Sequence, residues 1–109
     1  MSVTIIRAEG NHLDNTRKLH FSRSISSEAF YMRCWSKAVE ETGSKLFRDS
    51  SDFEVSDLEQ VMSELKSQLA WAEANLTEND LYYMKERIEH LLECIPKACE
   101  ESDLPFQIY

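Results

Sequence analysis

Glycine and proline are scarce in this chain of 109 residues, which holds only two of each, at Gly10, Gly43, Pro96 and Pro105. A loop that cradles phosphate groups is built from closely spaced glycines, so this shortage excludes a site of that kind. It also favours helices joined by short turns, because glycine and proline are the residues that most often interrupt regular structure.

Long apolar runs are missing as well, and the cysteines are few. No apolar run approaches the roughly 18 residues that a membrane span needs. Residues 1–7 lack the charged start and the long apolar stretch of a signal peptide, so we expect a cytoplasmic protein that binds no membrane. The cysteines are Cys34, Cys94 and Cys99, and their odd number argues against a disulfide framework.

The acidic residues are distributed unevenly, in a chain with a formal net charge of -8. Residues 1–55 hold eight basic and eight acidic side chains, whereas residues 56–109 hold four basic and twelve acidic ones. The whole excess therefore belongs to the second half. A one-sided field of this kind steers a basic partner. The other interpretation is a charged helix face that only keeps the protein soluble.

Short segments near the amino terminus have the composition of strands. Residues 3–8 are a β-branched run that ends at the turn signal Gly10-Asn11, and residues 18–22 alternate enough to predict a second strand. Residues 106–109 at the other end are also strand-like. We expect this last segment to pair with the first strand, which would be marginal alone.

A first helix is predicted from about Glu28 to Thr42. Ser26 and Ser27 are suitable N-cap residues, and Gly43 suits the left-handed conformation just past the end. Residues 44–55 then form a connector with room for one helical turn.

Two further helices are predicted in the acidic half. Ser56 and Glu59 fit a capping box for the earlier one, and Thr77 followed by Asp80 marks the start of the later one. Each has an apolar stripe at helical spacing. The stripes comprise Leu58, Val61, Met62, Leu65, Leu69, Ala72 and Leu76, and then Leu81, Met84, Ile88, Leu91, Leu92, Ile95 and Cys99. A turn as short as residues 75–77 makes the two helices antiparallel neighbours.

Pro96 lies inside the second stripe, where it removes a helical hydrogen bond. The last helix therefore ends near Glu93, or kinks and continues to Glu101. Together these elements predict one α+β domain over residues 1–109. It is mostly α, with three main helices, an antiparallel hairpin of the last two, and a small sheet from the chain termini.

Catalytic and metal-binding patterns are weak. Glu86, His90 and Cys94 stand four residues apart and would line one helix face, where zinc is the metal to consider. A structural zinc site needs four ligands and no second cluster supplies the rest, so we expect no metal and no cofactor. No local signature orders a nucleophile with its base, and we expect no enzymatic activity.

A small basic patch is formed by Arg17, Lys18, His20 and Arg23 around Phe21. It offers a contact for an acidic partner or for RNA, or it balances the acidic half within the fold. The net charge of the chain opposes a phosphate backbone, so nucleic acid is not the expected partner.

Aromatic side chains off the apolar stripes are the strongest signal for a protein-binding surface. Trp71 lies off the stripe of its helix, beside polar residues, and Tyr82 and Tyr83 flank the stripe of the next one. Exposed aromatics among acids are typical of binding hot spots. Burial of Trp71 under the first helix or the strands is the open alternative. The predicted partner-binding residues are Glu64, Trp71, Tyr82, Tyr83, Glu86, Glu89, His90 and Glu93.

In size, charge asymmetry and lack of a catalytic motif, the chain resembles the bacterial immunity proteins that neutralise nuclease toxins of the contact-dependent inhibition and colicin types. The resemblance is one of general character over the whole chain, and it carries over no single residue. It implies tight one-to-one binding of a basic nuclease toxin domain, without catalysis.

Other functions stay open at this point. The exposed aromatics also suit a homodimer or adaptor surface, with the charge serving only solubility. An inhibitor that mimics DNA would need acidic groups spaced like phosphates.

Overall fold

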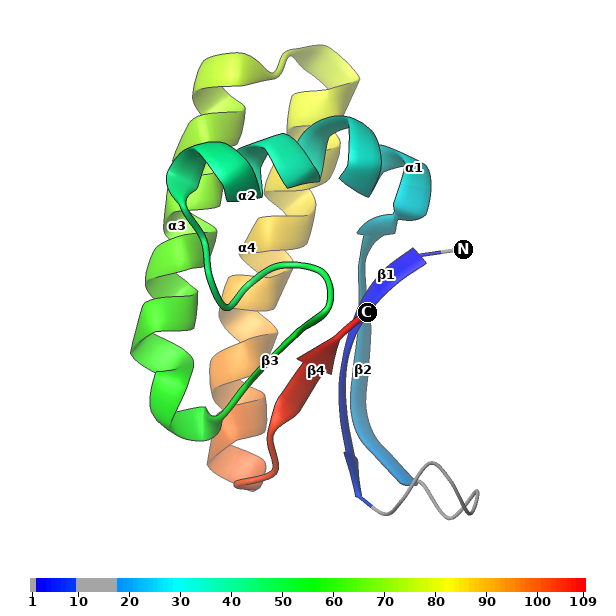
Figure 1. The fold of residues 1–109 in the computed structure, drawn as a ribbon, viewed down its shortest axis with the longest axis vertical. Coiled ribbons are helices and arrows are strands. Elements are labelled where there is room, and N and C mark those ends of the chain that lie inside the picture. Colours follow the sequence, from blue (N-terminus) through cyan, green and yellow to red (C-terminus); the bar gives the residue numbers. More distant parts are fainter. Residues whose placement is uncertain (1, 10–17) are drawn as a thin grey trace.

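The computed structural model describes residues 2–9 and 18–109, which form an α+β fold (Figure 1). Four antiparallel strands make one sheet: β1 (Ser2–Glu9), β2 (Lys18–Ser27), β3 (Ser51–Phe53) and β4 (Phe106–Ile108). Their order is β2-β1-β4-β3, so the first and last strands of the chain are the central pair. Ile5 opposes Ile108 and Ile6 opposes Gln107. The predicted sheet from the chain termini is confirmed; the Gly10-Asn11 turn lies outside the described residues.

The edge strand β2 is irregular. Its register against β1 shifts between Val3 and Thr4 and again between Arg7 and Ala8, which leaves Ile25 and His20 as the extra residues of β2. Bulges of this kind disrupt a regular ladder, and natural proteins use them to protect sheet edges from other chains. The two bulges therefore make β2 a poor template for a strand from a partner.

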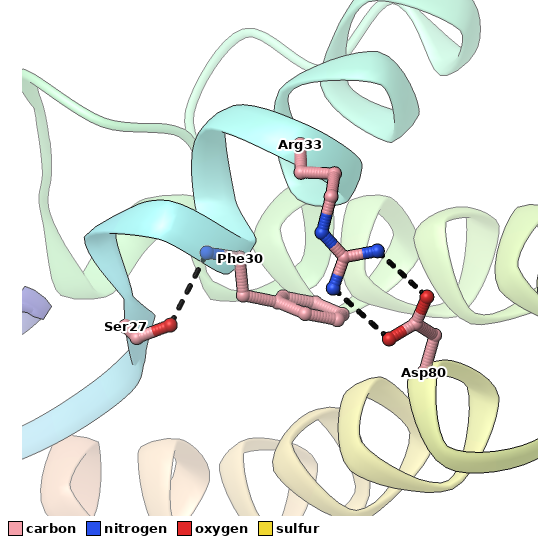
Figure 2. A network of polar contacts seen from close by, with 4 residues as sticks. All are labelled: Ser27, Phe30, Arg33 and Asp80. Atoms are coloured by element: carbon pink, nitrogen blue, oxygen red, sulfur yellow. Dashed lines mark hydrogen bonds and ion pairs between the residues drawn. The ribbon is translucent and has the colours of Figure 1, made fainter.

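The first helical segment begins and ends where the sequence predicts. It consists of α1 (Glu28–Phe30), a π-helix (Tyr31–Trp35) and α2 (Ser36–Thr42). The Ser27 hydroxyl accepts a hydrogen bond from the Phe30 backbone N–H at 3.2 Å (Figure 2). Gly43 has φ 70°, the left-handed conformation that ends the helix. The π-helical turn in the middle is a feature that the apolar spacing does not predict.

The connector contains β3 and a single 3-10 turn (Val55–Asp57) before α3 (Leu58–Asn75). The predicted capping box of Ser56 and Glu59 is wrong. The box is formed two residues earlier, by Glu54 and Asp57, and the Glu54 N–H donates to Asp57 Oδ2 at 2.9 Å. The 3-10 turn lies directly ahead of α3. The capping pair therefore stands before Leu58, the residue at which the apolar stripe of α3 begins.

Helices α3 and α4 (Glu78–Glu101) lie side by side as the predicted hairpin, joined by Leu76 and Thr77 (Figure 1). Thr77 is the N-cap of α4, but its side chain makes no capping hydrogen bond. Pro96 lies inside α4, which continues to Glu101, so an end near Glu93 is wrong. The sheet packs against α4, and the first helical segment crosses the α3–α4 pair (Figure 1).

The core has a polar network at its centre. Trp35 is fully buried, and its Nε1 donates to Gln68 Oε1 at 2.8 Å. The Gln68 amide nitrogen donates to Ser44 Oγ and to the Phe47 carbonyl, both at 3.0 Å. Every polar group of the buried Gln68 side chain thus has a partner, and α3 is tied to the first helical segment and to the connector.

Arg7 on β1 binds the carboxyl-terminal end of α4. Its side chain is 2% exposed, and it donates hydrogen bonds to the carbonyls of Ala98 and Leu104. Its guanidinium carbon lies 4.1 Å from the centre of the Phe106 ring. A cation at the end of a helix interacts favourably with the free carbonyls there, so Arg7 holds β1, α4 and β4 together.

Candidate functional site

The outer face of α4 carries a stripe of exposed side chains. Met84, Ile88, Leu91 and Ile95 fill the buried side of this helix. The opposite side is solvent-exposed along about 36 Å, the length of its 24 residues. Four of the predicted partner-binding residues lie together on it: Tyr82, Glu86, Glu89 and Glu93. We call these four residues the α4 stripe.

Tyr82 is the most exposed aromatic side chain in the described part of the chain, at 71%. With Lys85, Glu86 and Glu89 it lines a hollow of about 310 Å³. Glu93 forms an ion pair with Lys97 at 3.2 Å, in which both side chains are largely exposed, so it contributes little to stability. The α4 stripe thus presents carboxylates and one aromatic ring that the fold itself does not use.

His90 and Tyr83 lie to the side of the stripe. His90 is exposed, whereas Tyr83 is half-buried. The Tyr83 hydroxyl accepts a hydrogen bond from the Ser27 N–H at 3.1 Å, and its ring meets Phe30 edge-on at 4.7 Å between centres. Tyr83 therefore holds the start of the first helical segment against α4, which is a role in the fold.

Glu64 on α3 is also engaged within the fold. Its carboxylate accepts hydrogen bonds from the backbone N–H groups of Lys45, Leu46 and Phe47, at 3.2, 3.0 and 2.8 Å. Gln60 Nε2 donates to it as well, at 3.0 Å. Burial alone would raise the pKa of Glu64, but these hydrogen bonds outweigh burial and lower it. This carboxylate anchors the connector and is not free for a partner.

Trp71 is half-buried and packs against the hydrophobic core, so it is neither fully exposed nor sealed inside. It lines a cleft with residues of the first helical segment, and its indole nitrogen is buried without a hydrogen-bond partner. The structure therefore divides the predicted site. It brings the α4 stripe together, with His90 beside it. It engages Glu64 with the connector, Tyr83 with the start of the first helical segment, and Trp71 with the core.

Sequence reasoning missed Gln68 and Arg7, although Gln68 left a signal. Gln68 follows Val61 by seven residues and precedes Ala72 by four, so it lies on the buried period of α3. A polar residue on that period predicts a buried hydrogen-bond network. Arg7 left no comparable signal, because its partners are backbone carbonyls 91 and 97 residues away.

Metal-ligand clusters and helices suited to span a membrane are absent from residues 2–9 and 18–109. Within these ranges no group of three His, Cys, Asp or Glu side chains is placed to hold a metal ion. No helix there has both the length and the apolar character that crossing a bilayer requires. Of the predicted basic patch, His20 and Arg23 are exposed on β2, and Arg17 lies outside the described residues.

Comparisons of the chain with models of known families, with curated proteins and with solved structures found no match.

Proposed function

We propose that this protein is a small acidic binding protein that inhibits a basic protein partner, and that the partner is the nuclease domain of a toxin. The observation that carries the proposal is the α4 stripe, which leaves three carboxylates and the Tyr82 ring exposed along one helix. A nuclease must hold a phosphate backbone, so its cleft is positively charged. An acidic helix face competes for such a cleft and associates with it fast.

Homodimerisation through the same face is the other candidate, and the geometry disfavours it. A two-fold interface brings the same patch of both copies together. The carboxylates of Glu86, Glu89 and Glu93 in one copy would then face the same acidic patch of the other copy, and like charges across an interface cost binding energy. A dimer found by size-exclusion chromatography without any partner would favour this candidate.

The test combines capture with inhibition. The tagged wild-type chain and a variant with Tyr82→Ala, Glu86→Lys and Glu89→Lys are each used to capture proteins from cells of the native host. We expect the wild type to retain a basic protein with nuclease activity that added wild-type chain suppresses. We expect the variant to retain none of it, because its stripe has lost the ring and reversed two charges.

The matched control is Glu59→Lys with Glu73→Lys, which reverses two exposed charges on α3. This control should capture and inhibit as the wild type does. Equal capture by the stripe variant would refute the site, and a captured protein whose activity the wild-type chain leaves unchanged would refute inhibition.

A further inference from the structure

A cleft of about 360 Å³ lies between the first helical segment and the turn that joins α3 to α4. Its size falls in the range of small-molecule sites, roughly 300 to 1,000 Å³. It shares no residue with the α4 stripe. The cleft is lined by Arg33, Cys34, Lys37 and Glu41 from the first segment and by Trp71, Asn75, Leu76 and Asp80 from the other side.

Two irregular features of the fold meet in this cleft. The π-helix Tyr31–Trp35 supplies Arg33 and Cys34 to its lining, and π-helical turns recur at functional sites. The indole nitrogen of Trp71, another lining residue, is buried and has no hydrogen-bond partner. A buried donor without an acceptor is rare in folded proteins. The coincidence of both features singles out this cleft from the other hollows.

The charges around the cleft are partly paired. Arg33 makes two hydrogen bonds to Asp80, at 2.7 and 3.0 Å, so these two residues neutralise each other (Figure 2). Lys37 and Glu41 have no ion pair or hydrogen bond within the described part of the chain. They are one helical turn apart on the same segment. The cleft therefore offers one available cation and one available anion as neighbours.

The rest of the lining is uncharged. Cys34 is buried, and burial raises the pKa of its thiol, so the thiol is neutral near pH 7. Leu76 is partly buried, and Trp71 adds an aromatic surface. A ligand of this cleft thus meets one available cation, one available anion and an apolar surface. A simple anion would be repelled by Glu41, and a simple cation by Lys37.

We propose that the cleft binds a small zwitterion of the α-amino-acid class with an apolar or aromatic side chain. The carboxylate of the ligand pairs with Lys37, its ammonium group pairs with Glu41, and its side chain lies against Trp71 and Leu76.

The probe is the set of free amino acids, added singly at millimolar concentration to the full chain. Intrinsic tryptophan fluorescence and the thermal unfolding midpoint are measured, because a ligand that binds only the folded state raises that midpoint. We expect at least one apolar amino acid to change both signals. Its N-acetyl derivative, which lacks the ammonium group, should bind at least tenfold more weakly.

Two variants test the assignment of charges. Lys37→Met and Glu41→Gln each remove one exposed charge, and each should weaken binding about tenfold or more. Glu41→Gln should also bind the free amino acid and its N-acetyl derivative equally well. Lys66→Met is the matched control, because it removes an exposed lysine outside the cleft and should leave the affinity unchanged.

Three results would overturn the proposal. The first is that no amino acid changes either signal. The second is an affinity that neither Lys37→Met nor Glu41→Gln alters. The third is an equal loss of affinity in Lys66→Met, which would indicate non-specific electrostatic attraction. None of them bears on the α4 stripe, because the two sites have separate residues.

Discussion

Helices α3 and α4 each carry a pair of closely spaced polar residues, Glu64 and Gln68 on α3 and Glu86 and Glu89 on α4. The two pairs differ in what their side chains contact. On α3, Glu64 and Gln68 form seven hydrogen bonds with the first helical segment, the connector and Gln60. On α4, Glu86 and Glu89 are exposed and have no hydrogen bond or ion pair within the described residues. The difference shows that an acidic helix face is available to a partner only where no connector folds back over it.

The connector is the cause of this difference. Residues 44–47 pass along α3, and their backbone N–H groups need acceptors, which Glu64 supplies. The carboxylates on the outer side of α4 are exposed in the described chain, so they keep their hydration. Substitutions of the α3 pair should therefore lower the free energy of unfolding, whereas substitutions of the α4 pair should weaken binding of the partner.

The largest expected effect on stability is that of Gln68→Leu. This change keeps the volume of the side chain but leaves Trp35 Nε1 without an acceptor and the Phe47 carbonyl without its donor, while Ser44 Oγ keeps its hydrogen bond with Thr42 Oγ1. Each buried group left unpaired costs about 1–3 kcal/mol, so we expect a loss of about 3 kcal/mol in the free energy of unfolding. Urea denaturation measures it, with Glu73→Leu as the control, an exposed residue on the same helix that has no hydrogen bond in the described chain. A loss below about 1 kcal/mol would show that the network is not a source of stability.

The positions of these residues also show how far the sequence predicts the fold. Local residue chemistry determines the helix start at Glu28, the N-cap position at Thr77, the stop at Gly43 and the terminal strands. These features are predicted correctly. The π-helix and the Glu54–Asp57 capping box depend on how the connector packs, and local spacing does not contain that information.

For the candidate site, too, the sequence predicts which residues share a helix face but not which face is covered. Helical periodicity places Tyr82, Glu86, Glu89 and Glu93 on one face, as the structure has them. It also places Glu64 and Trp71 off the apolar stripe of α3, but it cannot tell that the first helical segment and the connector cover that side. Contacts between segments far apart in the chain decide which polar face stays open.

The second effect is the pH dependence that Glu64 confers. Its pKa is lowered in the folded protein, so its carboxylate stabilises the fold above the pKa of the unfolded chain, about 4.3. That stability is lost as pH falls through the lower pKa of the folded state. Glu64→Gln should therefore flatten the fall of unfolding free energy below about pH 4.3, and it should cost about 1 kcal/mol at pH 7, since the site is only half-buried.

Urea denaturation of the wild type and of Glu64→Gln between pH 3 and pH 7 measures this contribution. Glu89→Gln is the matched control, because it removes an exposed carboxylate that has no backbone donors in the described chain. If Glu64→Gln and the wild type fell in parallel below pH 4.3, the three backbone hydrogen bonds to Glu64 would not be what holds the connector.

The smallest expected effect on stability is that of the double change Glu86→Gln and Glu89→Gln. Both side chains are exposed, and surface substitutions of this kind change the free energy of unfolding by about 0.5 kcal/mol or less. Removing two like charges from an acidic helix face also relieves repulsion, so the small change in the free energy of unfolding can have either sign.

The same double variant should associate more slowly with the basic partner. Its association rate should also depend less on salt, because screening acts on the charges that steer the encounter. Stopped-flow mixing with the captured partner at low and high salt measures both quantities. A variant that unfolded at lower urea concentration than Glu64→Gln would show that the α4 carboxylates serve the fold, and the contrast between the two helices would then be lost.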